Sequence, residues 1–430
     1  MRKLLLLGLL LSITSFLFSQ RISKFINAKK VKRIEEVLAA DDMQGRKAFT
    51  PAAEKAAGFI AGEFKKAGLQ TYKGNNSFLQ EFAMIQPKFI SANAIVDGES
   101  FSEQKIFVVT TQASLKVTDQ SGYGKASIKK GNNLTAVARE LIGRKENLIV
   151  TVDTSFASNL SRLGSLKRNL FQTGKSVIFL LTDKEPTTFS IEAKHEIQES
   201  KLMNVVGVLP GKSLKNEYVI FSGHYDHLGI GRPNQEQDSI FNGANDDSAG
   251  VTAVIMLARY FVKKMNNQRT LIFTALTAEE AGGYGANYFS KQFDPAEVIA
   301  MFNIEMIGTE SKWGTNSAYI TGYEKTNMGE ILQKNLNGSK FSFHPDPYPE
   351  QKLFYRSDNA TLARLGVPAH TITTSKMDSE KYYHTQDDEI ETLDIKNMAE
   401  IIKAIALSSR SIISGEDTPT RVAADKLENR

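Results

Sequence analysis

From about residue 203 onwards, short apolar segments alternate with longer amphipathic ones, and this alternation constrains the fold more than any other feature of the sequence. Helices are predicted over residues 251–264 and 394–413, the second with Asp394 as its N-cap. The predicted strands are MNVVGVLPG and EYVIFSG, expected to be adjacent, followed by RTLIFTAL, AMFNIEMIG and VPAHTIT. This pattern predicts an α/β fold with a mixed, mostly parallel central sheet flanked by helices.

The chain before residue 203 has two regions of different character. Residues 33–69 predict helix: LAADDMQGR predicts a turn after a short helix, and residues 52–69 have an apolar face that ends at Gly68. Residues 88–202 contain short β-like segments, separated by polar links and without a pattern of catalytic residues. They predict an inserted, mainly β domain. A protease-associated domain is one candidate for it, although no motif supports that assignment.

The N-terminus has the pattern of a secretory signal peptide. Arg2 and Lys3 precede an apolar run from Leu4 to Phe18, which is shorter than the roughly 20 residues of a membrane span. We expect export to the periplasm or the exterior and a mature protein without a membrane span; an uncleaved anchor is the alternative. The expected organisation is a signal peptide over residues 1–19, a main domain over 20–87 and 203–414, the insertion over 88–202 and a flexible tail over 415–430.

Composition limits the chemistry that the chain can perform. It contains no cysteine, which excludes thiolate metal sites, cysteine nucleophiles and disulfides, and it has only six histidines. Any bound metal must therefore be held by imidazole and carboxylate. The formal net charge is +5, of which Arg2 and Lys3 belong to the predicted signal peptide. A surplus that small predicts no nucleic-acid partner.

Polar side chains follow the predicted strands, where the ligands of such sheets bind. In FSGHYDHLG, His224 is the candidate ligand, Asp226 can orient its ring across a turn, and His227 is the alternative ligand. In GANDDSAGV, Asp246 or Asp247 stands between a strand and a helix. Either can be a helix N-cap, but a carboxylate at such a turn can also bridge two cations.

Three further segments add to this set. TAEEAGGYGA places Glu279 and Glu280 after a buried strand, and because adjacent side chains diverge, one can bind metal while the other acts as general base. Glu305 is predicted inside the apolar strand FNIEMIG, where a carboxylate needs a cation. His384 lies in a polar loop before the last helix. Imidazoles and carboxylates together suit zinc, manganese or cobalt, and two such ions about 3.5–4 Å apart form a hydrolytic centre.

The order and wording of these five segments resemble the co-catalytic zinc exopeptidases, the family of bacterial leucyl aminopeptidases, glutamate carboxypeptidase II and the glutaminyl cyclases. The resemblance covers roughly residues 30–90 and 203–413 and implies the zinc-exopeptidase fold with two zinc ions per chain. It implies the ligand sets His224, Asp246 and Glu305 for one ion and Asp246, Glu280 and His384 for the other.

The same resemblance assigns the remaining roles. Glu279 matches the general base, Asp226 the carboxylate that orients the first histidine, and Asp247 follows a peptide bond that is often cis in relatives. Two positions depart from the family pattern: Glu305 stands where Asp is common, and Asn359 replaces the His of a frequent SDH triplet. We infer no ligand at Asn359. Tyr355 and Tyr383 are both candidates for the group that holds the oxyanion.

The sequence therefore predicts metal-dependent hydrolysis of peptide bonds, with release of N-terminal amino acids from peptides as the expected activity. A carboxypeptidase, a single-zinc glutaminyl cyclase and a non-catalytic binding protein on the same fold are the alternatives. The intact first ligand His224 disfavours the cyclase, and the full set of ligands disfavours the binding protein. The absence of a GxSxG elbow disfavours a serine hydrolase, and HEIQE lacks the second His of HExxH. Oligomeric state and the preferred terminal residue are not predicted.

Overall fold

The computed structural model describes residues 22–428, so the predicted signal peptide lies outside the described part. The chain divides into two compact units, one formed by Met1–Glu81 with Leu202–Arg430 and the other by Phe82–Lys201. The second unit corresponds to the insertion predicted over residues 88–202, but it begins earlier, at Phe82. No helix within the described part is long and apolar enough to cross a membrane.

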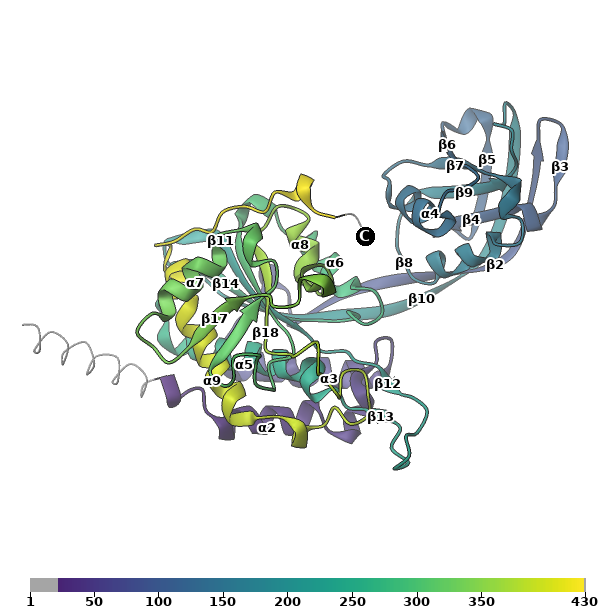
Figure 1. Ribbon diagram of the computed structural model, residues 1–430. Coiled ribbons are helices and arrows are strands. Elements are labelled where there is room, and N and C mark those ends of the chain that lie inside the picture. The colour runs from purple at the N-terminus through teal and green to yellow at the C-terminus, as the bar shows by residue number, and fades with distance from the viewer. Residues whose placement is uncertain (1–21, 429–430) are drawn as a thin grey trace, which may run out of the picture. The chain divides into compact units, whose positions relative to one another are not determined.

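The first unit contains a mixed sheet flanked by helices, which confirms the predicted fold class (Figure 1). Its strands run in the order β17-β16-β18-β15-β11-β14-β10. Strands β14, β11, β15 and β18 are parallel to their neighbours within this group, whereas β10 and β16 each add an antiparallel pair. The bounds are β10 Phe189–Leu209, β11 Leu214–His224, β14 Arg269–Leu276, β15 Val298–Ile304, β16 Ser317–Ile320, β17 Ser342–Pro345 and β18 Ala369–Thr373.

One predicted pairing is wrong. MNVVGVLPG and EYVIFSG are consecutive in the sequence and were expected to be adjacent, but β14 lies between β10 and β11. Val205 of β10 pairs with Ala275 of β14, and Phe221 of β11 pairs with Phe273 on the other side of the same strand. The sequence could not show this, because apolar strands buried on both faces give no signal about their neighbours.

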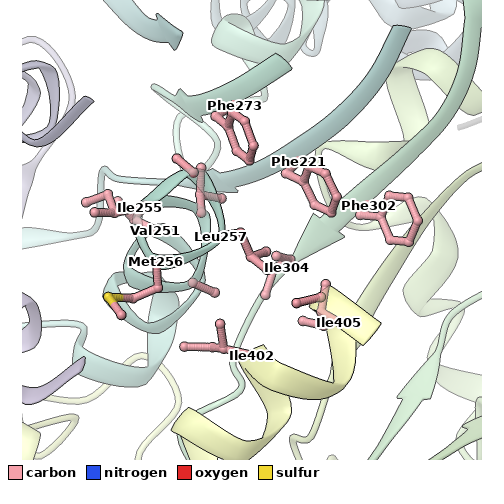
Figure 2. Packing of buried hydrophobic residues seen from close by; sticks show 14 of the residues in the cluster. Phe221, Val251, Ile255, Met256, Leu257, Phe273, Phe302, Ile304, Ile402 and Ile405 are labelled. Carbon is pink, nitrogen blue, oxygen red and sulfur yellow. The ribbon is translucent and has the colours of Figure 1, made fainter. Parts of the chain in front are cut away.

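The three central strands place alternate side chains in two cores. Phe221, Phe273 and Phe302 stack across β11, β14 and β15, with ring centroids 5.5 Å and 4.9 Å apart. They face helices α5 (Ala249–Lys264) and α9 (Ile395–Ser408), as Figure 2 shows. The next side chain along each strand points to the opposite face, where α6 (Tyr284–Ser290) and α8 (Asn359–Ala363) contribute to a second cluster. A sheet covered on both faces leaves only its strand ends open for chemistry.

The N-terminal region forms two helices, α2 (Ala28–Leu38) and α3 (Pro51–Ala67), and LAADDMQGR, which predicts a turn, contains the 3-10 turn Asp41–Arg46 between them. Gly68 ends α3 in the left-handed conformation, with φ at 90°. The predicted helix over 394–413 is also divided, into α9 and α10 (Arg410–Ser414), and Asp394 caps α9 by accepting from the N–H groups of Lys396 and Asn397.

The second unit has its own sheet and core. Strands β4, β9, β7 and β6 pair in that order, and helix α4 packs with them. The pairs β6–β7 and β7–β9 are parallel and β4–β9 is antiparallel. The bounds are β4 Ile106–Thr110, β6 Gly124–Ile128, α4 Leu134–Gly143, β7 Leu148–Val152 and β9 Ser176–Leu181.

The C-terminal stretch differs from the flexible tail expected over residues 415–430. Arg269 donates to the carbonyl of Asp417 and the hydroxyl of Thr418, both at 2.7 Å or less. Further along, Arg421 donates to the carbonyl of Val298 at 2.7 Å. Side chains from the body of the first unit therefore anchor the described part of this stretch, which composition alone did not indicate.

Candidate metal centre

The predicted site residues converge because β14, β11 and β15 are neighbouring parallel strands whose carboxyl ends meet at one edge. His224 is the last residue of β11, and Glu279 and Glu280 follow β14 by three and four residues. Glu305 comes directly after β15, rather than inside the strand as predicted, because β15 ends at Ile304. It is part of a group of carboxylate and imidazole atoms within 4.8 Å of one another.

Asp246 lies between the two histidines assigned by the resemblance. Its Oδ1 is 3.2 Å from Nε2 of His224, and its Oδ2 is 3.2 Å from Nε2 of His384. Glu305 Oε1 is 4.0 Å from the first imidazole, and Glu280 Oε1 is 3.1 Å from the second. Each oxygen of the Asp246 carboxylate thus faces a separate group of donor atoms, which is the arrangement that a bridging ligand needs.

His227 also lies in this cluster, although the sequence offered it only as an alternative to His224. Its Nδ1 is 2.9 Å from Glu280 Oε1 and 3.9 Å from Asp246 Oδ2. The structure therefore places the two histidines of HYDHLG on opposite sides of Asp246, and neither replaces the other.

The carboxylates of the cluster stabilise positive charge on the neighbouring imidazole rings. Burial opposes protonation of His224, but its hydrogen bond with Asp246 and the nearby carboxylates raise its pKa well above the usual value. Hydrogen bonds to Asp246 and Glu280 likewise raise the pKa of His384 to about 10. Burial raises the pKa of Glu305, with further contributions from neighbouring carboxylates. The same carboxylates would stabilise cations bound among these groups.

The donor set fits zinc. Four donor atoms at 2.0–2.1 Å around a tetrahedral zinc lie about 3.3 Å apart, close to the 3.1–3.2 Å separations around Asp246. The second oxygen of Glu305 is buried without a hydrogen-bond partner among the described residues, and a metal ion would be a partner for this carboxylate. With no cysteine in the chain, imidazole and carboxylate are the ligands that remain.

Asp226 acts differently from the sequence prediction. Nδ1 of His224 lies 3.1 Å from the main-chain carbonyl oxygen of Asp226, and no hydrogen bond joins the ring to the carboxylate. The carboxylate instead accepts the N–H of Glu279 at 3.0 Å. Asp226 therefore orients His224 through its main-chain carbonyl. Its side-chain carboxylate fixes the turn that carries Glu279 and Glu280.

Burial raises the pKa of Glu279 well above its usual value; His224 opposes the shift and Asp358 adds to it. Glu280 shares a candidate metal group with His227 and Asp246, whereas Glu279 is in neither of the two groups found among the described residues. The adjacent carboxylates thus face different surroundings, as their divergence along the backbone predicts.

Three further buried residues hold the site together through contacts that the sequence did not predict. Asp247, joined to Asp246 by a cis peptide bond, accepts the N–H groups of His224, Gly250 and Met306. Asp388 accepts the N–H groups of Asn245 and Asp246 at 2.8 Å and 3.0 Å. Arg46 donates to four main-chain carbonyls, those of Leu38, Tyr225, Asn242 and Gly243. Arg46 and Asp388 stand in the motifs DDMQGR and QDDEI, and Asp247 in GANDDSAGV, but most of their hydrogen-bond partners lie far away in sequence.

A cavity adjoins the cluster, lined among others by Glu305, Met306, Arg356 and Tyr383. The ring of Tyr383 stacks on His384, with centroids 3.8 Å apart. Tyr355, the other candidate for holding the oxyanion, accepts at its hydroxyl the N–H of Glu428 near the C-terminus. These contacts favour Tyr383.

Asn359, which replaces the histidine of the SDH triplet, forms hydrogen bonds that stabilise the fold. Its amide donates to the carbonyls of Phe354 and Ala369, and its side-chain oxygen accepts from Thr371 at 2.9 Å. These contacts occupy the side chain within the fold, consistent with the inference that it is no ligand.

The fold and the donor set define a zinc exopeptidase. Residues 204–408 match the model of peptidase family M28, which confirms the resemblance. The chain is 25% identical over 376 residues to a protein of Arthroderma otae named "Probable leucine aminopeptidase", covering 82% of this chain and 94% of that one. It is 29% identical over 218 residues to leucine aminopeptidase 1 of Ajellomyces dermatitidis, covering 46% of this chain and 53% of the relative.

Solved structures show the same fold. The aminopeptidase from Aneurinibacillus sp. strain AM-1 aligns with a TM-score of 0.52 and 16% identity, over 95% of this chain and 98% of that one. BSAP, a zinc aminopeptidase from Bacillus subtilis, aligns with a TM-score of 0.54 and 15% identity, over 91% and 97% of the two chains. At these identities the likeness concerns the fold alone.

Proposed function

We propose that the chain is an aminopeptidase that releases N-terminal amino acids from peptides with two zinc ions bridged by Asp246. The observation that carries the proposal is the division of the cluster around this carboxylate, with one imidazole 3.2 Å from each oxygen. His224 and Glu305 would complete the first zinc site, and Glu280 and His384 the second. The names of the relatives in Arthroderma and Ajellomyces support the choice of aminopeptidase among the activities of the fold.

In this mechanism the ions, when bound, polarise the scissile carbonyl and lower the pKa of an attacking water. Glu279 accepts the proton of that water on a carboxylate oxygen and returns it to the leaving amine. Burial raises the pKa of Glu279, which suits a group that must hold a proton between two steps. The hydrogen bond from the N–H of Glu279 to Asp226 holds the turn that carries both glutamates. Tyr383, which lines the adjoining cavity, would donate to the oxyanion.

The proposal is tested with a panel of peptides that differ only at their ends. Zinc-loaded protein should cleave peptides with a free α-amino group one residue at a time from that end. N-acetylated versions of the same peptides should not be cleaved, whereas amidation of the carboxyl end should leave the rate unchanged. Cleavage that begins at the carboxyl end would identify a carboxypeptidase, and cyclisation of N-terminal glutamine without hydrolysis would identify a cyclase.

A further inference from the structure

His227 has no role in the proposed mechanism, although its ring is fully buried beside the second zinc site. Nδ1 of this ring lies 2.9 Å from Glu280 Oε1, within hydrogen-bonding distance, and 3.9 Å from Asp246 Oδ2, beyond it. The ring therefore has one polar partner in the cluster, the carboxylate assigned to the second zinc ion.

The identity of the two atoms determines which of them donates. An ionised carboxylate only accepts hydrogen bonds, so Nδ1 of His227 must carry the hydrogen. Nε2 is then the bare nitrogen, and it is buried without a hydrogen-bond partner among residues 22–428. If Nδ1 bound zinc directly, Nε2 would carry the hydrogen and a buried N–H group would lack an acceptor. Histidines that bind metal almost always pair that second N–H, so the contacts favour donation to Glu280 over metal ligation.

The position of the ring is fixed independently of Glu280. Gly243 has φ at 56°, and a Cβ at this residue would lie 2.6 Å from Cγ and Cδ2 of His227. Only glycine therefore leaves room for the ring at this point. Arg46 ties together the two segments involved, because it donates to the carbonyl of Gly243 at 2.9 Å and to that of Tyr225 at 2.8 Å.

We propose that His227 is a positioning residue that donates its Nδ1–H to Oε1 of Glu280 and so fixes this carboxylate toward the second zinc ion. The proposal rests on the proposed function in one respect, the assignment of Glu280 as a ligand. Hydrogen bonds to metal-binding side chains restrict their orientation, and loss of such a partner typically weakens metal affinity by about 10–100-fold.

Two variants separate the hydrogen bond from the bulk of the ring. In His227→Asn, the amide nitrogen comes close to the place of Nδ1 and can still donate, whereas His227→Leu keeps a similar volume without a donor. His344→Leu is the matched control, because His344 lies on β17 and stacks on Trp313 with centroids 4.1 Å apart. Zinc affinities are measured by competition with a chromophoric chelator, and Glu280→Gln identifies which of the two affinities belongs to the second site.

We expect His227→Leu to weaken zinc binding at the second site by about 10–100-fold and to leave the first site unchanged. His227→Asn should restore most of the affinity, and His344→Leu should bind as the wild type does. Circular dichroism of the metal-free proteins checks the fold; if His227→Leu does not fold, His227→Met, which also lacks a donor, takes its place.

Two results would overturn the proposal. Wild-type zinc affinity in His227→Leu would show that the hydrogen bond does not position Glu280. Failure of His227→Asn to restore affinity, together with X-ray absorption spectra in which wild-type protein has one more imidazole nitrogen on zinc than the variant, would make His227 a direct ligand. Failure of the proposed function would look different: normal zinc affinities in the wild type, without aminopeptidase activity.

Discussion

At the scale of single residues, the central question is how two adjacent, chemically identical carboxylates perform different tasks. Glu280 Oε1 lies 2.9–3.1 Å from the imidazole nitrogens of His227 and His384. Although burial works in the other direction, these hydrogen bonds lower the pKa of Glu280 to about 2, while burial raises that of Glu279. One carboxylate is thus adapted to stay ionised as a ligand and its neighbour to take up a proton.

The glutamate pair gives a direct prediction. Glu279→Gln should keep both zinc ions, because no ligand is lost, but its kcat should fall by about 10²–10⁴, the usual contribution of a positioned general base. Glu280→Gln should lose zinc from the second site and recover part of its activity in excess zinc. Elemental analysis and turnover measured on both variants check this. If Glu279→Gln lost a metal ion and Glu280→Gln kept both, the two roles would be reversed.

Single residues also show how far the sequence alone could lead. Local motifs marked the segments that hold His224, Asp246, Glu280, Glu305 and His384, because each follows a predicted strand or precedes a predicted helix, and the family resemblance chose among their residues. The partners of Asp226 could not, because whether the ring of His224 meets the carbonyl or the carboxylate depends on how the loop folds. Local sequence identifies polar residues near strand ends, but hydrogen bonds between distant segments choose among their atoms.

At the scale of elements, the site depends on how closely helix α5 approaches the end of β15. Gly250, in the first turn of α5, faces the carbonyl of Ile304 and the carboxylate of Asp247 without any side chain between them. The same Asp247 carboxylate accepts the N–H groups of His224 and Met306. Contact between the helix and the strand thus positions the ligands of the first zinc site.

A pair of glycine substitutions tests this contact. Gly250→Ala should lower the free energy of unfolding by about 1–3 kcal/mol, because its Cβ would overlap with these atoms, and it should also weaken zinc binding at the first site. Gly58→Ala is the control, since Gly58 lies inside α3 with no atom within 4 Å of an added Cβ. It should raise stability by about 0.5–1 kcal/mol. Equal stability of both variants in chemical denaturation would contradict the proposed role of the contact.

The helices and strands also show what the hydrophobic periodicity of the sequence could not predict. Strands β11, β14, β15 and β18 were predicted close to their observed positions, but β16, β17 and the order β11-β14-β10 were not. A turn was predicted at LAADDMQGR, but not its form, a 3-10 turn over Asp41–Arg46 that contains Gln44 and Gly45 at positive φ. That turn brings Arg46 to the carbonyls around the metal centre, and such tertiary contacts leave no periodic pattern.

At the scale of the whole molecule, export stays a prediction, because it concerns residues 1–19, outside the described part of the chain. Arg2, Lys3 and the apolar run that follows motivate it. Mass spectrometry of protein from the periplasm or the medium of expressing bacteria should give a new N-terminus near Gln20. Protein that stays in the cytosol and retains Met1 would contradict the signal-peptide assignment.

The account as a whole depends on two metal ions in one centre that shares Asp246. Elemental analysis of the purified protein, followed by removal of metal with a chelator and stepwise return of zinc, tests this most directly. The account predicts close to two zinc ions per chain, loss of aminopeptidase activity in the metal-free protein, and full recovery only as the second equivalent of zinc binds. A metal-free preparation with full activity, or complete recovery at one equivalent, would contradict it.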